Sequence, residues 1–268
     1  MLLEDRVAIV TGGAVGIGRG IALKFAEEGC LVVVADISEE EGENTVKEVS
    51  QKGSKGLFIK CDVTSSSQIG GMVEQTISKF GKLDILVNNA GGVPGVIQGG
   101  SIVDITDEMW DTFINLNLRS AFFGCRAVVP HMKERRYGKI INLSSIGAIQ
   151  PSASVIHYHS AKAGVLGLTC NLAYDLAPYN ICVNAIMPGP IRTPFWEPVT
   201  RDIPDKDALF SLIARKNVPL QRIGTPEDVA GAALFLASEL SAYVTGESIC
   251  VAGGIPLLPH DPGMKKKD

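Results

Sequence analysis

Short runs of aliphatic and β-branched residues recur along the chain, and helical patterns separate them. The first run, Val7 to Val10, meets a glycine-rich turn, after which Ile17, Ile21 and Phe25 recur at a spacing of four residues. This order predicts a strand, a turn and a helix. Further strands are predicted over 32–35, up to about Cys61, and over 83–88, 140–143, 181–186 and 248–251.

These strands are apolar throughout rather than alternating, which is typical of a parallel sheet covered by helices on both faces. The pattern therefore predicts an α/β fold with a doubly wound, seven-stranded parallel sheet of the Rossmann type. Linkers rich in Pro, Gly or Ser do not interrupt it, so we expect a single domain over 1–256. A solvated C-terminal tail is expected over 257–268.

Composition narrows the class of protein. The chain has 268 residues, of which 46% are hydrophobic, and a formal net charge of -4. Without clustered Lys and Arg, this balance argues against a nucleic-acid partner. The six cysteines are widely separated and form no CxxC pair, so we expect no zinc site and a reducing, cytoplasmic location. The N-terminal apolar run is too short for a membrane span, and no histidines have metal-ligand spacing.

Glycines gather where the first strand turns into the first helix. The segment 11–18 contains four of them, and glycine there lets the backbone approach a pyrophosphate at the helix N-terminus. A glycine-rich turn of this kind is as often a chain reversal that binds no ligand. Asp36, however, closes the second strand, and its carboxylate can accept hydrogen bonds from both hydroxyls of an adenosine ribose. The same carboxylate would repel a 2′-phosphate, so NAD is favoured over NADP. The alternative is that Asp36 is only an acid at a helix N-terminus.

Candidate catalytic groups lie at two later positions. Tyr158 and Lys162 are four residues apart on a helix predicted to run to about Leu176, so they share one face. A nearby cation lowers the pKa of a phenol, which is ordinarily near ~10. An isolated pair of this spacing occurs often by chance, but Ser144 and Ser145 close the fifth strand, where ligands meet a parallel sheet. Strand alternation turns only one serine toward the crevice; we select Ser145, with Ser144 supporting it.

Together these residues resemble the classical short-chain dehydrogenases/reductases over nearly the whole chain. The matching motifs are the TGxxxGxG turn, the acidic Asp36, Cys61-Asp62-Val63, the NNAG stretch at 88–91, Asn117, Ser145, the YxxxK pair and Pro188-Gly189. No single motif is specific, whereas the set is.

The resemblance implies a role for each matching position. Tyr158 would be the general base in oxidation and the general acid in reduction, and Ser145 would polarise the substrate oxygen. Lys162 would bind the nicotinamide ribose and tune Tyr158, and Asn117 would hold a water that links Lys162 to solvent. The implied cofactor-binding residues are Gly12, Val15, Gly16, Ile17, Gly18, Asp36, Ile37, Asp62, Val63, Asn89, Ala90, Gly91, Tyr158, Lys162, Pro188, Gly189, Ile191 and Thr193.

The segment over about 190–216 resembles the small substrate lid of this family, and it contains two aromatic residues, Phe195 and Trp196. With Ser145 and Tyr158 they suggest a small apolar or ring-bearing secondary alcohol or ketone, such as a hydroxysteroid, although lid aromatics can also only pack the lid shut. His157 and His159, which flank Tyr158, are expected to be packed or exposed rather than functional.

Two other functions stay open. A 3-oxoacyl-thioester reductase of the same fold would meet an acidic carrier through the cations of one helix, namely Arg119, Arg126, Lys133, Arg135 and Arg136. A non-catalytic dinucleotide-binding sensor is disfavoured by the intact serine, tyrosine and lysine.

Apolar or small residues on more than one face of the helices around 110–128 and 161–176 predict a partner surface. The resemblance implies a homotetramer formed through these two helices.

Overall fold

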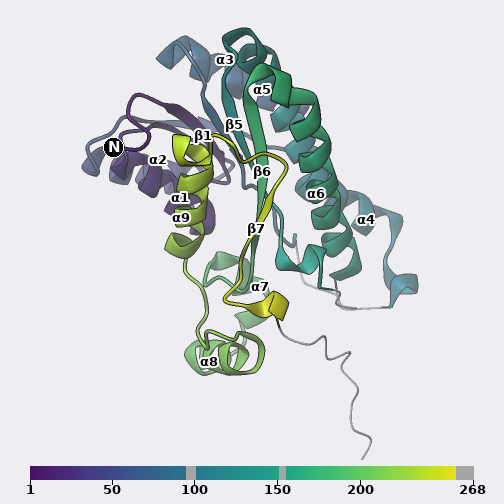
Figure 1. Ribbon diagram of the computed structural model, residues 1–268. Helices are drawn as coiled ribbons and strands as arrows, with labels where there is room; N and C mark the ends of the chain where they lie inside the picture. Colours follow the sequence, from purple (N-terminus) through teal and green to yellow (C-terminus); the bar gives the residue numbers. More distant parts are fainter. Residues whose placement is uncertain (95–100, 151–154, 258–268) are drawn as a thin grey trace, which may run out of the picture.

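The computed structural model describes residues 1–94, 101–150 and 155–257, and its centre is one parallel sheet. Seven strands lie in the order β3-β2-β1-β4-β5-β6-β7, as Figure 1 shows in part. Their bounds are β1 Val7–Thr11, β2 Leu31–Asp36, β3 Gly56–Lys60, β4 Ile85–Asn88, β5 Gly138–Leu143, β6 Ile181–Pro188 and β7 Ser248–Val251. The predicted seven-stranded parallel sheet is confirmed. The tail beyond residue 257 lies outside the described residues.

Helices cover both faces of the sheet because adjacent strand residues point to opposite sides. Ala8 and Val10 belong to a core cluster with α1 (Gly16–Glu27) and α9 (Pro226–Ala237). Ile9, between them, belongs to the opposite cluster with α3 (Ser66–Phe80), α5 (Ser120–Arg135) and α6 (Ile156–Leu176). The sheet is therefore doubly wound, and its strand order reverses between β1 and β4, where such sheets open a ligand crevice.

The predicted helix around 110–128 is interrupted by a wider turn. It consists of α4 (Asp107–Ile114), a π-helical turn over Asn115–Arg119, and α5. The second helix of the fold, α2 (Glu39–Gln51), begins after Ser38 as predicted, but the Ser38 hydroxyl donates to the Glu41 carboxylate instead of accepting a backbone N–H.

A small helical lid follows the carboxyl end of β6. It contains a 3-10 turn over Pro194–Trp196, α7 (Glu197–Thr200) and α8 (Lys206–Asn217), and Figure 1 shows α7 and α8 beyond the end of the sheet. The chain then returns through 218–224 to α9. Among the described helices, none has the length and apolar character needed to cross a bilayer.

Candidate active site

The glycine-rich turn after β1 is held by the end of β4. Gly12 has φ +62°, and a Cβ there would lie 2.9 Å from Cα of Ala90. The Asn89 side-chain amide donates to the carbonyls of Thr11 at 2.9 Å and Gly12 at 3.0 Å, while the Thr11 hydroxyl accepts the N–H groups of Asn89 and Ala90 at 3.1 Å. The contacts of the Asn89 side chain therefore fix the shape of the turn at which α1 begins.

The residues predicted to receive the adenosine half of a dinucleotide gather beside this turn. The Asp36 carboxylate, at the end of β2, accepts N–H groups from Ala14 at 3.0 Å and Ser38 at 3.1 Å and stays partly exposed. Two apolar side chains next to it face solvent, since Ile37 is 67% and Val15 is 42% exposed. A carboxylate bordered by exposed apolar surface fits a ribose with an attached flat base.

Lys162 and the two serines join α6 to the end of β5. Lys162 is buried, and its Nζ donates to the carbonyl oxygen of Leu143 at 2.9 Å. The Ser144 hydroxyl donates to the carbonyl oxygen of Lys162 at 2.8 Å, whereas Ser145 Oγ accepts the Gly147 N–H at 3.1 Å. The Ser144 hydroxyl thus holds the backbone of Lys162. Ser145 lies where the loop after β5 begins.

Burial sets the proton affinity of the two key groups. Desolvation raises the pKa of Tyr158 to about 12, an effect that the nearby Ser145 hydroxyl partly offsets. Desolvation also lowers the pKa of Lys162 to about 8. The lysine Nζ lies 5.8 Å from the centre of the tyrosine ring. The lysine was expected to lower the tyrosine pKa, but at this distance, with its Nζ bonded to Leu143, the effect of burial is larger.

Asn117, in the π-helical turn, binds the loop after β4. Its Oδ1 accepts the Gly92 N–H at 2.8 Å, and its Nδ2 donates to the carbonyls of Gly92 at 2.9 Å and Phe113 at 3.2 Å. A Cβ on Gly91 would lie 2.8 Å from Asn117 Oδ1 and 3.1 Å from Lys162 Nζ. Only glycine fits there, so the loop, Asn117 and Lys162 form one wall. The water-holding role of Asn117 stays a prediction.

The segment after β6 forms the opposite wall and connects to the lid. Gly189 N–H donates to the Val251 carbonyl at 2.9 Å, and Ile191 pairs with Gly224 in an isolated parallel bridge. Thr193 caps the 3-10 turn that begins the lid, and its hydroxyl is 3.5 Å from the Ile191 carbonyl. These residues, predicted to flank the nicotinamide, lie on one extended strand end.

The two lid aromatics have different surroundings. The Phe195 ring centre is 6.1 Å from that of Tyr158, and Phe195 also faces Gly92. The Trp196 indole N–H donates to the Ile191 carbonyl at 2.8 Å, and its ring packs edge-on against Phe210 at 5.9 Å. Phe195 therefore borders the catalytic tyrosine, whereas Trp196 anchors the lid to the strand end.

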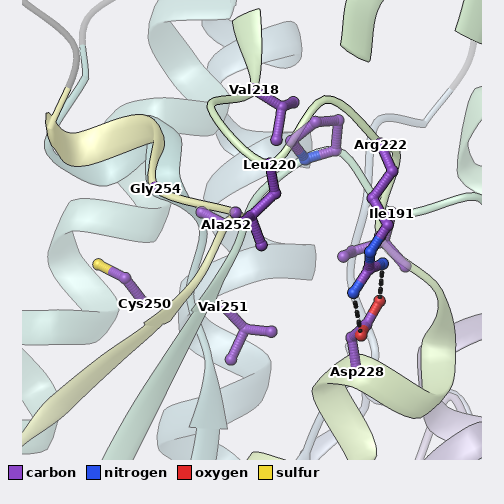
Figure 2. Close-up of a pocket in the computed structure, with 12 residues that line it drawn as sticks. Ile191, Val218, Leu220, Arg222, Asp228, Cys250, Val251, Ala252 and Gly254 are labelled. Carbon is purple, nitrogen blue, oxygen red and sulfur yellow. Dashed lines mark hydrogen bonds and ion pairs between the residues drawn. The ribbon is translucent and has the colours of Figure 1, made fainter. Parts of the chain in front are cut away.

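A cavity of about 320 Å³ lies behind Ile191. Figure 2 shows its apolar lining of Val218 and Leu220, and the Arg222–Asp228 ion pair beside it. The two terminal guanidinium nitrogens of Arg222 donate to the Asp228 carboxylate, at 2.6 and 2.7 Å. This contact lowers the pKa of Asp228 to about 2. The ion pair connects the segment that follows the lid to the start of α9. It therefore stabilises the chain that lines the cavity beside Ile191.

The histidines beside Tyr158 differ as well. His157 is buried and stacks on Phe113, with ring centres 3.7 Å apart, so it is packed as expected. His159 lies against Gly147, two residues after Ser145. The sequence does not distinguish the two histidines, because the contact of His159 with Gly147 depends on how α6 packs against the end of β5.

The fold and this constellation are typical of a Rossmann-type oxidoreductase. Residues 12–256 match the family model described as Enoyl-(Acyl carrier protein) reductase. The chain is 41% identical to (2S)-((R)-hydroxy(phenyl)methyl)succinyl-CoA dehydrogenase subunit BbsD of Thauera aromatica, with 95% of this chain and 98% of the relative covered. It is also 41% identical to the 3-oxoacyl-(acyl-carrier-protein) reductase FabG of Thermotoga maritima, with 95% and 99% covered.

Solved structures agree. Levodione reductase superposes with a TM-score of 0.88 at 32% identity, covering 94% of this chain and 98% of that one. The chain belongs to the short-chain dehydrogenase/reductase family. It is an oxidoreductase of that family, and members of the family bind nicotinamide dinucleotides.

Proposed function

We propose that the protein is an NAD(H)-dependent oxidoreductase that interconverts a secondary alcohol and a ketone. The observation that carries the proposal is the grouping of Ser145, Tyr158 and Lys162 at the carboxyl end of β5, beside a lid aromatic. A catalytically silent sensor would have no need for a buried lysine beside a partly buried tyrosine, since burial of polar groups costs free energy.

The chain's own groups supply the proton chemistry. In reduction, the Tyr158 hydroxyl donates its proton to the carbonyl oxygen while Ser145 donates a hydrogen bond to the same oxygen; in oxidation the tyrosine takes the proton back. Lys162 would hold the nicotinamide ribose through its Nζ, which lies close to the backbone of Gly91. The bound nicotinamide supplies or accepts the hydride.

Asp36 supports NAD as the cofactor. Its carboxylate is held toward the glycine-rich turn by two backbone N–H groups, and a fixed negative charge there favours a ribose 2′-hydroxyl over a 2′-phosphate. The Asp62 carboxylate, which accepts from Thr64 N–H and hydroxyl, would lie with Val63 near the adenine.

Phe195 supports an apolar or ring-bearing substrate, because its ring faces that of Tyr158 across the entrance. The relatives include a dehydrogenase named for a hydroxy(phenyl)methyl substrate, which carries a secondary alcohol beside an aromatic ring. We therefore propose that Phe195, Ser145 and Tyr158 contact the substrate, while Trp196 acts on the substrate only by holding the lid.

The relatives also favour a second candidate function, the reduction of a 3-oxoacyl thioester, since one of them is named for that reaction. The cations expected to meet an acidic carrier are, however, largely engaged. Arg126 donates to Ser66, Arg135 pairs with Asp84 at 2.9 Å, and Arg136 donates to the Pro178 carbonyl. This argues for a free or CoA-bound substrate over a carrier-bound one.

The experiment is turnover followed through NADH absorbance, with NADPH in parallel, on a panel of ketones and thioesters. Tyr158→Phe is expected to lower kcat by at least about a thousandfold, because the proton donor is lost, while NADH binding measured by fluorescence persists. Tyr243→Phe, at an exposed position between α9 and β7, is the control. Near-normal turnover by Tyr158→Phe would contradict the proposal, and NADH binding without turnover of any compound by the unmodified chain would favour the sensor.

We further propose a homotetramer assembled through α5 and α6, whose outer faces are exposed at Phe122 and Tyr174. The cytoplasmic location stays a prediction.

A further inference from the structure

The ring of His159 lies beside the catalytic tyrosine, and the reaction proposed above gives it no role. Its centre is 5.8 Å from the centre of the Tyr158 ring, with the planes tilted by 51°. The two rings flanking Tyr158 are thus Phe195 from the lid and His159 from its own helix. One is apolar, and the other can make hydrogen bonds.

The imidazole fills the space that a side chain at residue 147 would occupy. A Cβ on Gly147 would overlap the Nε2 and Cδ2 atoms of His159. Gly147 also donates its N–H to Ser145 Oγ at 3.1 Å. His159 therefore rests on the loop that holds the catalytic serine, and its Nε2 lies over that loop.

The protonation of the ring follows from its surroundings. Burial lowers the pKa of His159, and the neighbouring His157 lowers it further, so the imidazole is neutral at neutral pH and has one N–H donor and one bare nitrogen. Its Nδ1 is inaccessible to solvent and has no hydrogen-bond partner among the residues that the structure describes. Since a buried N–H without an acceptor is costly, the proton belongs on Nε2, the nitrogen over Gly147.

We propose that His159 determines substrate specificity by donating a hydrogen bond from Nε2 to a second oxygen of the substrate, close to the oxygen held by Ser145 and Tyr158. This inference rests on the function proposed above and narrows its substrate class. The substrate is a secondary alcohol or ketone with a further carbonyl or carboxylate near the reacting carbon, as in a 3-oxo ester or thioester. A plain ketone offers this N–H donor no acceptor, and that difference is the source of selectivity.

The test compares two substrates of equal chain length, ethyl 3-oxobutanoate and 2-heptanone. His159→Phe keeps a ring of similar shape but removes the donor, and it is expected to lower the ratio of kcat/KM for the ester to that for the ketone by about ten- to a hundredfold. The change should fall mainly on KM. His159→Gln restores a donor and should recover part of the ratio. Ser160→Ala, at the adjacent exposed residue, is the matched control.

A second measurement does not depend on turnover. In protein labelled with ¹⁵N-histidine, addition of NADH and ethyl 3-hydroxybutanoate, which cannot react with each other, should shift the His159 Nε2 signal, while the His131 signals on α5 stay unchanged. An equal loss for both substrates in His159→Phe would show a packing role and overturn the inference. If the unmodified chain reduces neither compound, the proposed function is wrong. An Nε2 signal that stays unchanged on addition of the ligands overturns the role of His159, independently of that result.

Discussion

At the scale of single residues, burial moves Tyr158 and Lys162, the proposed catalytic pair, toward their neutral forms. The pKa of Tyr158 is raised to about 12 and that of Lys162 is lowered to about 8. At neutral pH the phenol is therefore protonated and ready to donate, which suits ketone reduction. Alcohol oxidation needs the phenolate, which is scarce until the pH rises.

This asymmetry predicts different pH profiles for the two directions. Between about pH 6 and pH 9, kcat/KM for alcohol oxidation should rise with pH by up to about tenfold per pH unit. The reason is that the pKa of Tyr158 lies above this range, so its phenolate fraction grows about tenfold with each pH unit. Ketone reduction should show no matching rise, since the phenol stays protonated throughout. Steady-state kinetics in both directions, in one set of buffers, checks this; a flat profile for oxidation would contradict it.

At the scale of elements, the π-helical turn between α4 and α5 shows what local pattern can and cannot predict. The apolar spacing predicted a helix around 110–128, and a helix is there. The wider turn over Asn115–Arg119 includes Asn117, whose side chain bonds to the Gly92 backbone in the loop after β4, a contact that periodicity does not encode. π-turns recur at functional sites, and the motif match at Asn117 was the signal in the sequence.

A buried polar chain joins the three elements that carry the site. Asn88 of β4 donates to Asn142 of β5 at 2.9 Å, and Asn142 donates to the Thr169 hydroxyl of α6 at 3.0 Å. All three side chains are buried. Because a half-satisfied buried network costs more than an apolar core, this chain holds the end of β5 against α6 only while every member is paired.

Thr169→Val is therefore expected to lower the free energy of unfolding by about 1–3 kcal/mol, because it leaves the Asn142 amide unpaired while keeping the side-chain shape. Thr112→Val on α4 is a matched control, since its hydroxyl donates to the Glu108 carbonyl four residues earlier but is exposed. Thr169 makes the same local bond to Val165. Urea unfolding measures both; equal effects would remove the role given to Asn142.

At the scale of the whole molecule, the sheet could be predicted because each of its strands depends on a short stretch of sequence, and the structure brings the predicted residues Ser145, Tyr158 and Lys162 close to one another. Apolar runs marked the strands, and motifs marked Ser145, Tyr158 and Lys162. The different positions of Phe195 and Trp196 could not be predicted, because they are set by contacts with Tyr158, Ile191 and Phe210 from distant segments. The contact of His159 with Gly147 is of the same kind.

The assembly can be tested at a glycine that the monomer leaves open. A Cβ on Gly167, on the exposed face of α6, would meet no atom within 4 Å, so Gly167→Glu should leave the fold of one chain intact and favour the helix slightly. If α5 and α6 pack against a second copy, a charged side chain at this position separates them.

Sedimentation velocity is expected to show a tetramer for the unmodified chain and smaller species for Gly167→Glu, with circular dichroism unchanged. Gly70→Glu on α3, where a Cβ is equally free, should remain tetrameric. A tetramer that survives Gly167→Glu would place its contacts elsewhere than on α6, and an unmodified chain that sediments as a monomer would contradict the assembly itself. Because the helix that would form this contact also carries Tyr158 and Lys162, dissociation is further expected to lower thermal stability around the site.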